Sequence, residues 1–341
     1  MKNLRKYSLE KPVKPVFLYL IGILAWMLAF AAGIALGGTT LDAGSVWQDI
    51  LDGSMDSADS KIFLFVRLPR TLAALLCGGA LAVAGGVIQG VLANRLASPS
   101  VIGVNAGAGL AITVCTALGL YGGWQVSGFA FLGAFLAVLT VSLLARKWNA
   151  SKGTVILLGV AMNSLLGAFS DSIVTLIPTV GVMSNDFKVG EFTAITWPRL
   201  FPAAVLIGVA VIVLLTLGND LDVLSLGEDT ARGLGMHTGR MRTLFLLLAA
   251  LLSGCAVSLA GLLSFVGLMV PHVVRRFSGS RSLHLMGLCA LFGGAFVCLC
   301  DTLARTLFAP YEIPVGILMA FLGAPFFVML LFSRKGGLTG A

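Results

Sequence analysis

Charged residues are scarce in this sequence: they account for 11% of its 341 residues, against 58% for hydrophobic residues. Ordinary soluble domains carry about 25% charged residues, so this composition excludes a soluble globular domain. A membrane-spanning helix needs about 20 residues, and the length therefore accommodates about ten spans with short connectors. The sequence predicts an all-α, polytopic membrane protein.

Several motifs of soluble enzymes and binding proteins are missing as well. The chain lacks the pattern GxxxxGK[ST], so it cannot cradle a nucleotide phosphate in that way. Its six cysteines all fall in apolar segments without a CxxC pair, which favours packing over a disulfide framework or a metal site. The net charge of +8 is spread over short connectors, which indicates membrane orientation rather than nucleic-acid binding. We expect no enzymatic activity and no cofactor in this chain.

Apolar segments predict ten spans, at about 16–37, 71–92, 101–119, 125–145, 154–177, 199–217, 242–260, 262–276, 284–307 and 315–332. Basic clusters near the N-terminus and at 146–152, 232–242, 275–281 and 334–335 then fall on one side, which the positive-inside rule assigns to the cytoplasm. We therefore expect both termini there, with tails at 1–15 and 334–341 and one transmembrane domain at 16–333. The aspartates between 42 and 59 are expected in an acidic outer loop.

One long polar passage, residues 219–242, interrupts the apolar second half of the chain. Within it, Glu228 to Gly233 has the features of a short helix. Gly227 can cap it, acidic residues begin it where the helix dipole favours anions, and Gly233 or Gly235 can end it. A short exposed helix between two spans suits contact with another protein. A solvated connector without a partner is the alternative at this point.

Polar side chains inside spans are informative because each costs free energy unless it faces protein or water. Asp301 and Arg305 are four residues apart and can pair on one helix face. Asp171 lies between two serines in the outer half of the fifth span, which suits a wet wall. A proton-coupled secondary transporter is the alternative from a different class. It would use a chain of membrane carboxylates, and here only Asp171 and Asp301 qualify.

Longer motifs follow one another between about residues 62 and 331. They include Arg67-Leu68-Pro69-Arg70, Asn94-Arg95-Leu96-Ala97-Ser98-Pro99, the segments 226–235 and 265–275, and Gly323-Ala324-Pro325. In this order they resemble the permease family of ATP-binding-cassette (ABC) importers for ferric siderophores, haem and cobalamin. One departure is Arg95, where the family usually has proline, and we expect it to loosen this turn.

The resemblance implies a permease subunit in the bacterial cytoplasmic membrane, paired with a second copy of itself or a close paralogue. Two ATPase subunits, which hold ATP and Mg, would bind inside, and a substrate-binding protein would bind outside. Ferric siderophore is the expected cargo, with haem or cobalamin as alternatives. The short helix would couple the permease to the ATPase, through Leu226, Gly227, Glu228, Asp229, Ala231, Arg232, Gly233, Leu234 and Gly235.

The resemblance also assigns roles to three other groups of residues. Arg67, Arg70 and Arg305 would form a cationic outer rim that receives carboxylates of the binding protein, with local pairing to aspartates as the alternative. Asn94 and Leu96 would form the cytoplasmic gate. The pathway would lie on the dimer axis along the fifth and tenth spans. Helical spacing selects its wall: Asn163, Ser170, Asp171, Thr175, Met319 and Phe326.

Overall fold

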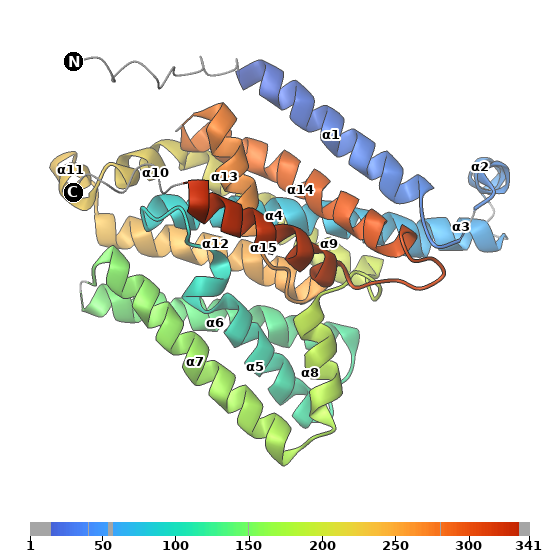
Figure 1. The fold of residues 1–341 in the computed structure, drawn as a ribbon, viewed down its shortest axis with the longest axis horizontal. Coiled ribbons are helices and arrows are strands. Elements are labelled where there is room, and N and C mark those ends of the chain that lie inside the picture. The colour runs from blue at the N-terminus through green and yellow to red at the C-terminus, as the bar shows by residue number, and fades with distance from the viewer. Residues whose placement is uncertain (1–14, 40, 54–56, 149, 280, 334–341) are drawn as a thin grey trace.

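The computed structural model describes residues 15–39, 41–53, 57–148, 150–279 and 281–333, so the predicted tails lie outside it apart from Pro15. All regular structure in these residues is helical (Figure 1). The elements are α1 (Pro15–Ala35), α2 (Ala43–Asp52), α3 (Ala58–Ile62), η1 (Phe63–Arg67), α4 (Leu68–Val91), η2 (Pro99–Ile102), α5 (Val104–Ala117), α6 (Gly123–Lys147), α7 (Lys152–Leu176), α8 (Val180–Val189), α9 (Trp197–Thr216), α10 (Gly218–Ser225), α11 (Glu228–Gly233), α12 (Thr238–Ala260), α13 (Val266–Ser278), α14 (Ser282–Thr306) and α15 (Val315–Ser333).

The prediction of an all-α, polytopic membrane protein is confirmed. Within the described residues, seven helical stretches are long and apolar enough to cross a membrane: α1, the continuous stretch Ala58–Val91, α6, α7, α9, α12 and α14. The shorter helices α5, α13 and α15 lie at the predicted third, eighth and tenth spans. Each predicted span therefore coincides with a helix. The count of ten crossings and the cytoplasmic termini stay predictions.

Helix α4 forms the centre of the bundle and contacts α12, α13 and α14 (Figure 1). Small residues allow this close approach. A Cβ added to Gly85 would lie 1.8 Å from the carbonyl oxygen of Gly267, and one added to Gly78 would lie 2.2 Å from that of Gly293. Glycine is therefore required where α4 crosses α13 and α14, as in other closely packed membrane helices.

The two ends of the bundle differ. Helices α10 and α11 lie at one end, and α2 and α3 lie at the opposite end (Figure 1). The expected acidic loop is partly helical, because its aspartates serve as hydrogen-bond acceptors for backbone groups. Asp42 caps α2 by accepting from the amides of Gly44 and Ser45, and Asp49 accepts from the amide of Ser57 at 2.9 Å. Asp56 lies outside the described residues.

Candidate functional site

Helix α11 forms at the predicted position in the polar passage, between Glu228 and Gly233. Gly227 precedes it with a φ of 120°, which disfavours any residue with a Cβ. At the other end, the amide of Gly235 (φ 84°) donates to the carbonyl of Arg232 at 2.9 Å. The amide of Met236 donates to the carbonyl of Ala231 at 3.0 Å, so the helix ends in a glycine-based cap.

Glu228 fixes α11 to the transmembrane helices. Its Oε1 accepts from Arg242 Nη1 at 3.0 Å, and its Oε2 accepts from Arg232 Nη2 at 3.4 Å. Arg242 lies near the start of α12 and is buried. It also donates to the carbonyl of Ala150 at 2.9 Å, in the connector between α6 and α7. A displacement of α11 would therefore be transmitted to α12 and to the start of α7.

A second contact fixes α10 in the same way. The Oδ1 atom of Asp222 accepts from the amide of Ser282 at 2.8 Å, at the first residue of α14. Because the first amides of a helix have no partner within it, this carboxylate caps α14 and ties α10 to it. The short helices α10 and α11 are thus connected to three transmembrane elements.

Two leucines next to α11 face away from the bundle: Leu226 is 66% exposed and Leu234 is 67% exposed. Asp229, Arg232, Gly233 and Gly235 are also exposed, as the predicted contact requires. Ala231 is fully buried, so its predicted place on the contact surface is wrong; it packs α11 against the bundle.

Next to Leu234 lies an open hollow of about 500 Å³, lined also by Asp220, Met236, His237 and Arg240. Exposed Leu234 at this hollow with charged groups, together with exposed Leu226 just before α11, forms a surface that suits another protein.

The predicted gate residues lie in a tight turn after α4. The Oδ1 atom of Asn94 accepts from the amide of Leu96 at 2.9 Å, and the carbonyl of Asn94 accepts from the amide of Ala97 at 3.1 Å. This side-chain turn closes the loop without the family's proline. Arg95 is exposed, and its expected loosening of this turn stays a prediction.

The predicted pathway residues on α7 lie on different faces of the helix, so some are exposed and others face the bundle. Asp171 and Thr175 are exposed and one turn apart. Asn163 is half-buried and donates to the carbonyl of Ser100 at 2.9 Å. Ser170 is buried, with its hydroxyl 2.8 Å from that of Thr113 in α5, so its predicted place on an open wall is wrong.

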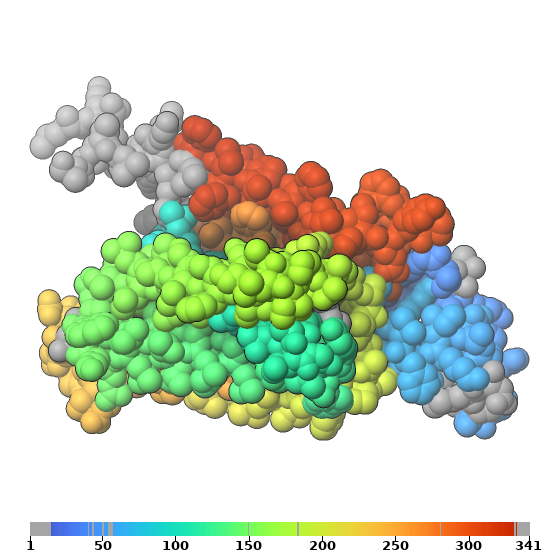
Figure 2. Space-filling view, turned by 90° about the horizontal axis from the view of Figure 1, so that it is seen from below, coloured from blue at the N-terminus to red at the C-terminus, as the bar shows by residue number. Residues whose placement is uncertain are grey.

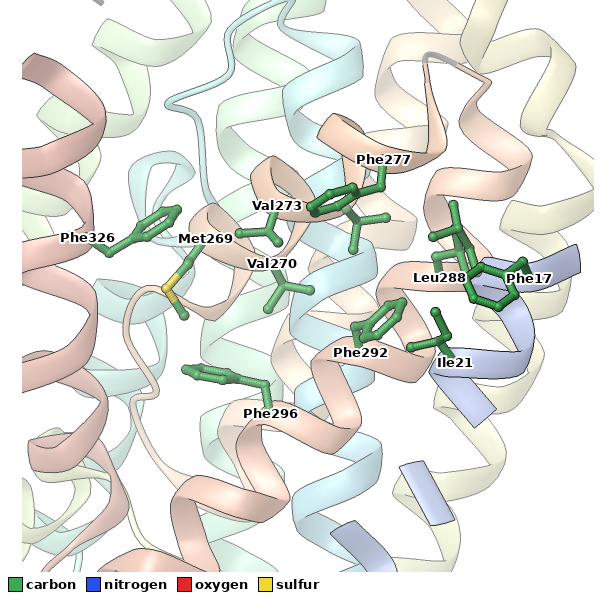
Figure 3. Close-up of a pocket in the computed structure, with 12 residues that line it drawn as sticks. Phe17, Ile21, Met269, Val270, Val273, Phe277, Leu288, Phe292, Phe296 and Phe326 are labelled. Carbon is green, nitrogen blue, oxygen red and sulfur yellow. The ribbon is translucent and has the colours of Figure 1, made fainter. Parts of the chain in front are cut away.

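On α15, both predicted wall residues face the bundle. Met319 is 1% exposed, which contradicts its predicted role. Phe326 is seven residues later on the same face and is half-buried. Its ring contacts His272 of α13 edge-on, with centroids 6.3 Å apart, and it lines an apolar groove rather than a polar wall (Figure 3).

A cavity with polar groups in its lining was not expected from the sequence; residues of α4, η2, α5 and the segment leading into α13 form it. It measures about 220 Å³ and is lined in part by Ser98, Ser100, Asn105, Ser264 and Phe265. The carbonyl of Ser100 accepts from Asn163 of α7, and the Phe265 side chain packs against Gly323 of α15. Figure 2 shows the face of the molecule across which α7 and α8 run, with α15 beside them. Phe265 has a φ of 65°, which is rare for a residue with a Cβ and could not be read from the sequence.

The three arginines predicted to form an outer rim are buried instead: Arg67, Arg70 and Arg305 are 4%, 7% and 3% exposed. Arg70 Nη2 lies 2.9 Å from Asp301 Oδ1, and its Nη1 lies 2.8 Å from Glu312 Oε2. Arg305 Nε is 3.7 Å from Asp301 Oδ2, so the predicted pairing within α14 is confirmed.

Arg67 and Arg305 also donate to backbone carbonyls. Arg67 donates to Ile34, Ala35 and Thr39, and Arg305 donates to Gly33, all at or just after the end of α1. The prediction of an exposed cationic rim is therefore wrong, because the chain itself uses these charges to join α1, α4, α14 and the segment before α15. We call these residues, with Asp301 and Glu312, the arginine cluster.

Comparison with known proteins places these features in context. Residues 24–333 match the model of the FecCD transport family. The chain is 34% identical over 335 residues to YfhA of Bacillus subtilis (strain 168), named as a probable siderophore transport system permease protein, with 96% of each chain covered. It is also 34% identical over 322 residues to the vitamin B12 import system permease protein BtuC of Yersinia pseudotuberculosis serotype O:1b (strain IP 31758), with 93% of each covered.

A solved structure agrees with these matches. It is described as an inward-facing conformation of an ABC transporter assigned to the metal-chelate type. The TM-score is 0.82 at 28% sequence identity, and the match covers 94% of this chain and 99% of that one.

Proposed function

The chain belongs to the FecCD transport family of ABC importer permeases, and from that premise we propose that it carries a ferric siderophore across the bacterial cytoplasmic membrane. Separate ATPase subunits supply the energy, and an extracytoplasmic binding protein delivers the cargo. Similarity to a siderophore permease at 34% identity supports this cargo, but the vitamin B12 permease is equally similar. Cobalamin and haem are therefore the alternative cargoes.

The surface around α11 is the observation that carries the coupling proposal. Exposed Leu226 and Leu234 would insert into a groove of the ATPase, while the contacts of Glu228 and Asp222 would pass its movement to α12 and α14. Transport requires an element with two states that a partner biases. A connector that contacts only solvent would not be expected to expose two leucines beside a helix that is held by ion pairs.

The proposed pathway lies between α7 and α15 and is completed by a second copy of the chain. Only 17% of the α7 residues in its most apolar 18-residue window are buried, so most of this helix is free to face a partner or lipid. Asp171 and Thr175 on its exposed face support a wet passage here.

A proton-coupled secondary transporter is the alternative mechanism. Of the two carboxylates it would need, Asp301 is already paired with Arg70 and Arg305. This pairing favours a structural role for Asp301 over proton relay, because a relay group must gain and lose its charge.

Reconstitution in vesicles with the cognate ATPase and binding protein tests the proposal. Uptake of ferric siderophores that requires ATP inside the vesicles, with no uptake of haem or cobalamin, is the expected result. Uptake driven by a proton gradient without the ATPase would refute the mechanism, and uptake of cobalamin alone would refute the cargo.

The variant Gly233→Trp tests the coupling surface. A Cβ added at Gly233 meets no atom within 4 Å, and Gly233 is exposed, so the fold should tolerate the larger residue while contact with the ATPase is blocked. Intact ATPase co-purification and uptake in this variant would show that α11 is not the coupling element.

A further inference from the structure

A wholly apolar groove lies between α1, α13, α14 and α15 (Figure 3). Its volume is about 560 Å³, and every side chain that lines it is apolar. Its walls include Phe17 and Ile21 of α1, Val273 and Phe277 of α13, and Phe292 and Phe296 of α14. We call it the α1–α14 groove.

The groove is elongated and open at its outer side. The lining stretch of α13 runs from Met269 to Phe277, and that of α14 runs from Leu288 to Phe296; each rises about 12 Å along its helix. Phe17 is 56% exposed, and Val273 and Phe277 are 41% and 46% exposed. Another molecule can therefore reach these walls from the membrane.

Two exposed arginines continue the groove walls at one end. Arg276 follows Val273 by three residues and Met269 by seven, and Arg281 precedes Leu288 by seven. Residues at the spacings of Arg276 share a helix face, so Arg276 prolongs the groove-lining face of α13, and Arg281 is the N-cap residue directly before α14. The contact between Asp222 and Ser282 places this end beside α10, and it engages the Asp222 carboxylate with a backbone amide.

The last turn of α13 also holds unsatisfied donors. Arg275 Nε and Ser278 Oγ are buried and have no hydrogen-bond partner within the described residues. Buried donors without acceptors are uncommon in folded proteins. A phosphate ester at this end of the groove would supply acceptor oxygens and negative charge together.

We propose that the α1–α14 groove binds an anionic phospholipid, with an acyl chain along the apolar walls and the phosphate between Arg276 and Arg281. An acyl chain gains little in moving from lipid to an apolar protein wall, so the headgroup supplies the selectivity. Basic pockets between transmembrane helices bind anionic headgroups in this way. This inference does not depend on the cargo or the coupling mechanism.

A second copy of the chain fits the groove less well. Two copies that met groove to groove about a twofold axis along the membrane normal would bring four arginines together at one depth. Juxtaposed like charges at an interface oppose association. The arginines that attract a phospholipid therefore disfavour this dimer.

Native mass spectrometry of the purified full chain in detergent tests the proposal. The chain is titrated with dioleoyl phosphatidylglycerol or dioleoyl phosphatidylcholine, which share acyl chains and differ in headgroup charge. We expect the wild type to retain about one phosphatidylglycerol in preference to phosphatidylcholine. In Arg276→Gln with Arg281→Gln, this preference should fall on the order of 25-fold, because each arginine contributes roughly a factor of five.

The matched control is Arg146→Gln with Lys147→Gln, two exposed basic residues in the last turn of α6 that do not line the groove. It should keep the wild-type preference. Equal losses in both double variants would indicate general surface attraction and overturn the site. So would a cross-link between copies through Val273→Cys, which would show that the groove is a protein interface. Normal retention of phosphatidylglycerol by a Val273→Trp variant, in which the groove is filled, would also overturn it.

Discussion

Two groups of arginines and carboxylates lie at opposite ends of this bundle, and they differ in how far their side chains are exposed. In the arginine cluster, Asp301 is 2% exposed and both of its arginine partners are buried. At the other end, the side chain of Glu228 is 29% exposed and contacts one buried arginine, Arg242, and one that is 61% exposed, Arg232.

The difference in burial indicates two different roles. The buried arginine cluster joins helices, and the partly exposed Glu228 group holds a surface helix in place. The arginine cluster uses its charges within the chain, so it joins helices that are distant in sequence. The Glu228 group uses one buried arginine to hold α11, while Asp229, Arg232 and Gly233 of this helix stay exposed. Both groups consist of arginines paired with carboxylates, so their roles cannot be told apart by residue type. The buried or exposed state of each side chain distinguishes them.

The largest change in stability is expected for Asp301→Asn. Loss of this carboxylate leaves Arg305 buried without an anionic partner and leaves Arg70 with Glu312 alone. Breaking a buried ion pair by removing one partner costs about 3–5 kcal/mol. Chemical denaturation of the purified protein in detergent measures this loss.

Glu312→Gln is the control for this prediction. The side chain of Glu312 is 37% exposed, and Arg70 keeps Asp301 in this variant, so the expected loss is below about 1 kcal/mol. If the two variants lost equal stability, the arginine cluster would not be the buried joint described above.

In both groups of charged residues, the features that depend on residues close together in the sequence could be predicted. The bounds of α11 follow from glycines and acidic residues within ten positions, and the pairing of Asp301 with Arg305 follows from one helical turn. The contact between Arg70 and Asp301 joins residues 231 apart, and no local pattern contains it. The cationic rim was implied by the family resemblance, and pairing with aspartates was only the alternative.

The errors on α7 and α15 have a related cause. A hydrophobic membrane helix shows weak contrast between its faces, because lipid and protein interior are both apolar. Ser170 and Met319 were therefore placed on an open wall, although Ser170 bonds with Thr113 and Met319 is buried. The short helices α2, α8 and α10 were not predicted because they are too short or too polar to register as spans.

A smaller change in stability is expected for Arg242→Gln at the α11 end. This variant loses charged hydrogen bonds to Glu228 and to the carbonyl of Ala150, which together should contribute about 2 kcal/mol. Arg232→Gln, the matched change at the exposed partner, should cost less than about 0.5 kcal/mol. Hydrogen exchange should show α11 opening more often in the first variant only. Greater loss in Arg232→Gln would mean that the exposed pair, rather than the buried one, holds the helix.

The smallest change in stability is expected for Leu234→Glu. This leucine is 67% exposed, and surface substitutions usually change the free energy of unfolding by less than about 0.5 kcal/mol. Its effect should appear in association, because a buried carboxylate without a partner opposes seating in an apolar groove of the ATPase. Leu51→Glu on α2, 68% exposed at the opposite end, is the control and should leave ATPase co-purification unchanged. If both variants bound the ATPase normally, Leu234 would belong to a solvated connector. If Leu51→Glu alone lost the ATPase, the two ends of the molecule would have to exchange the roles assigned to them.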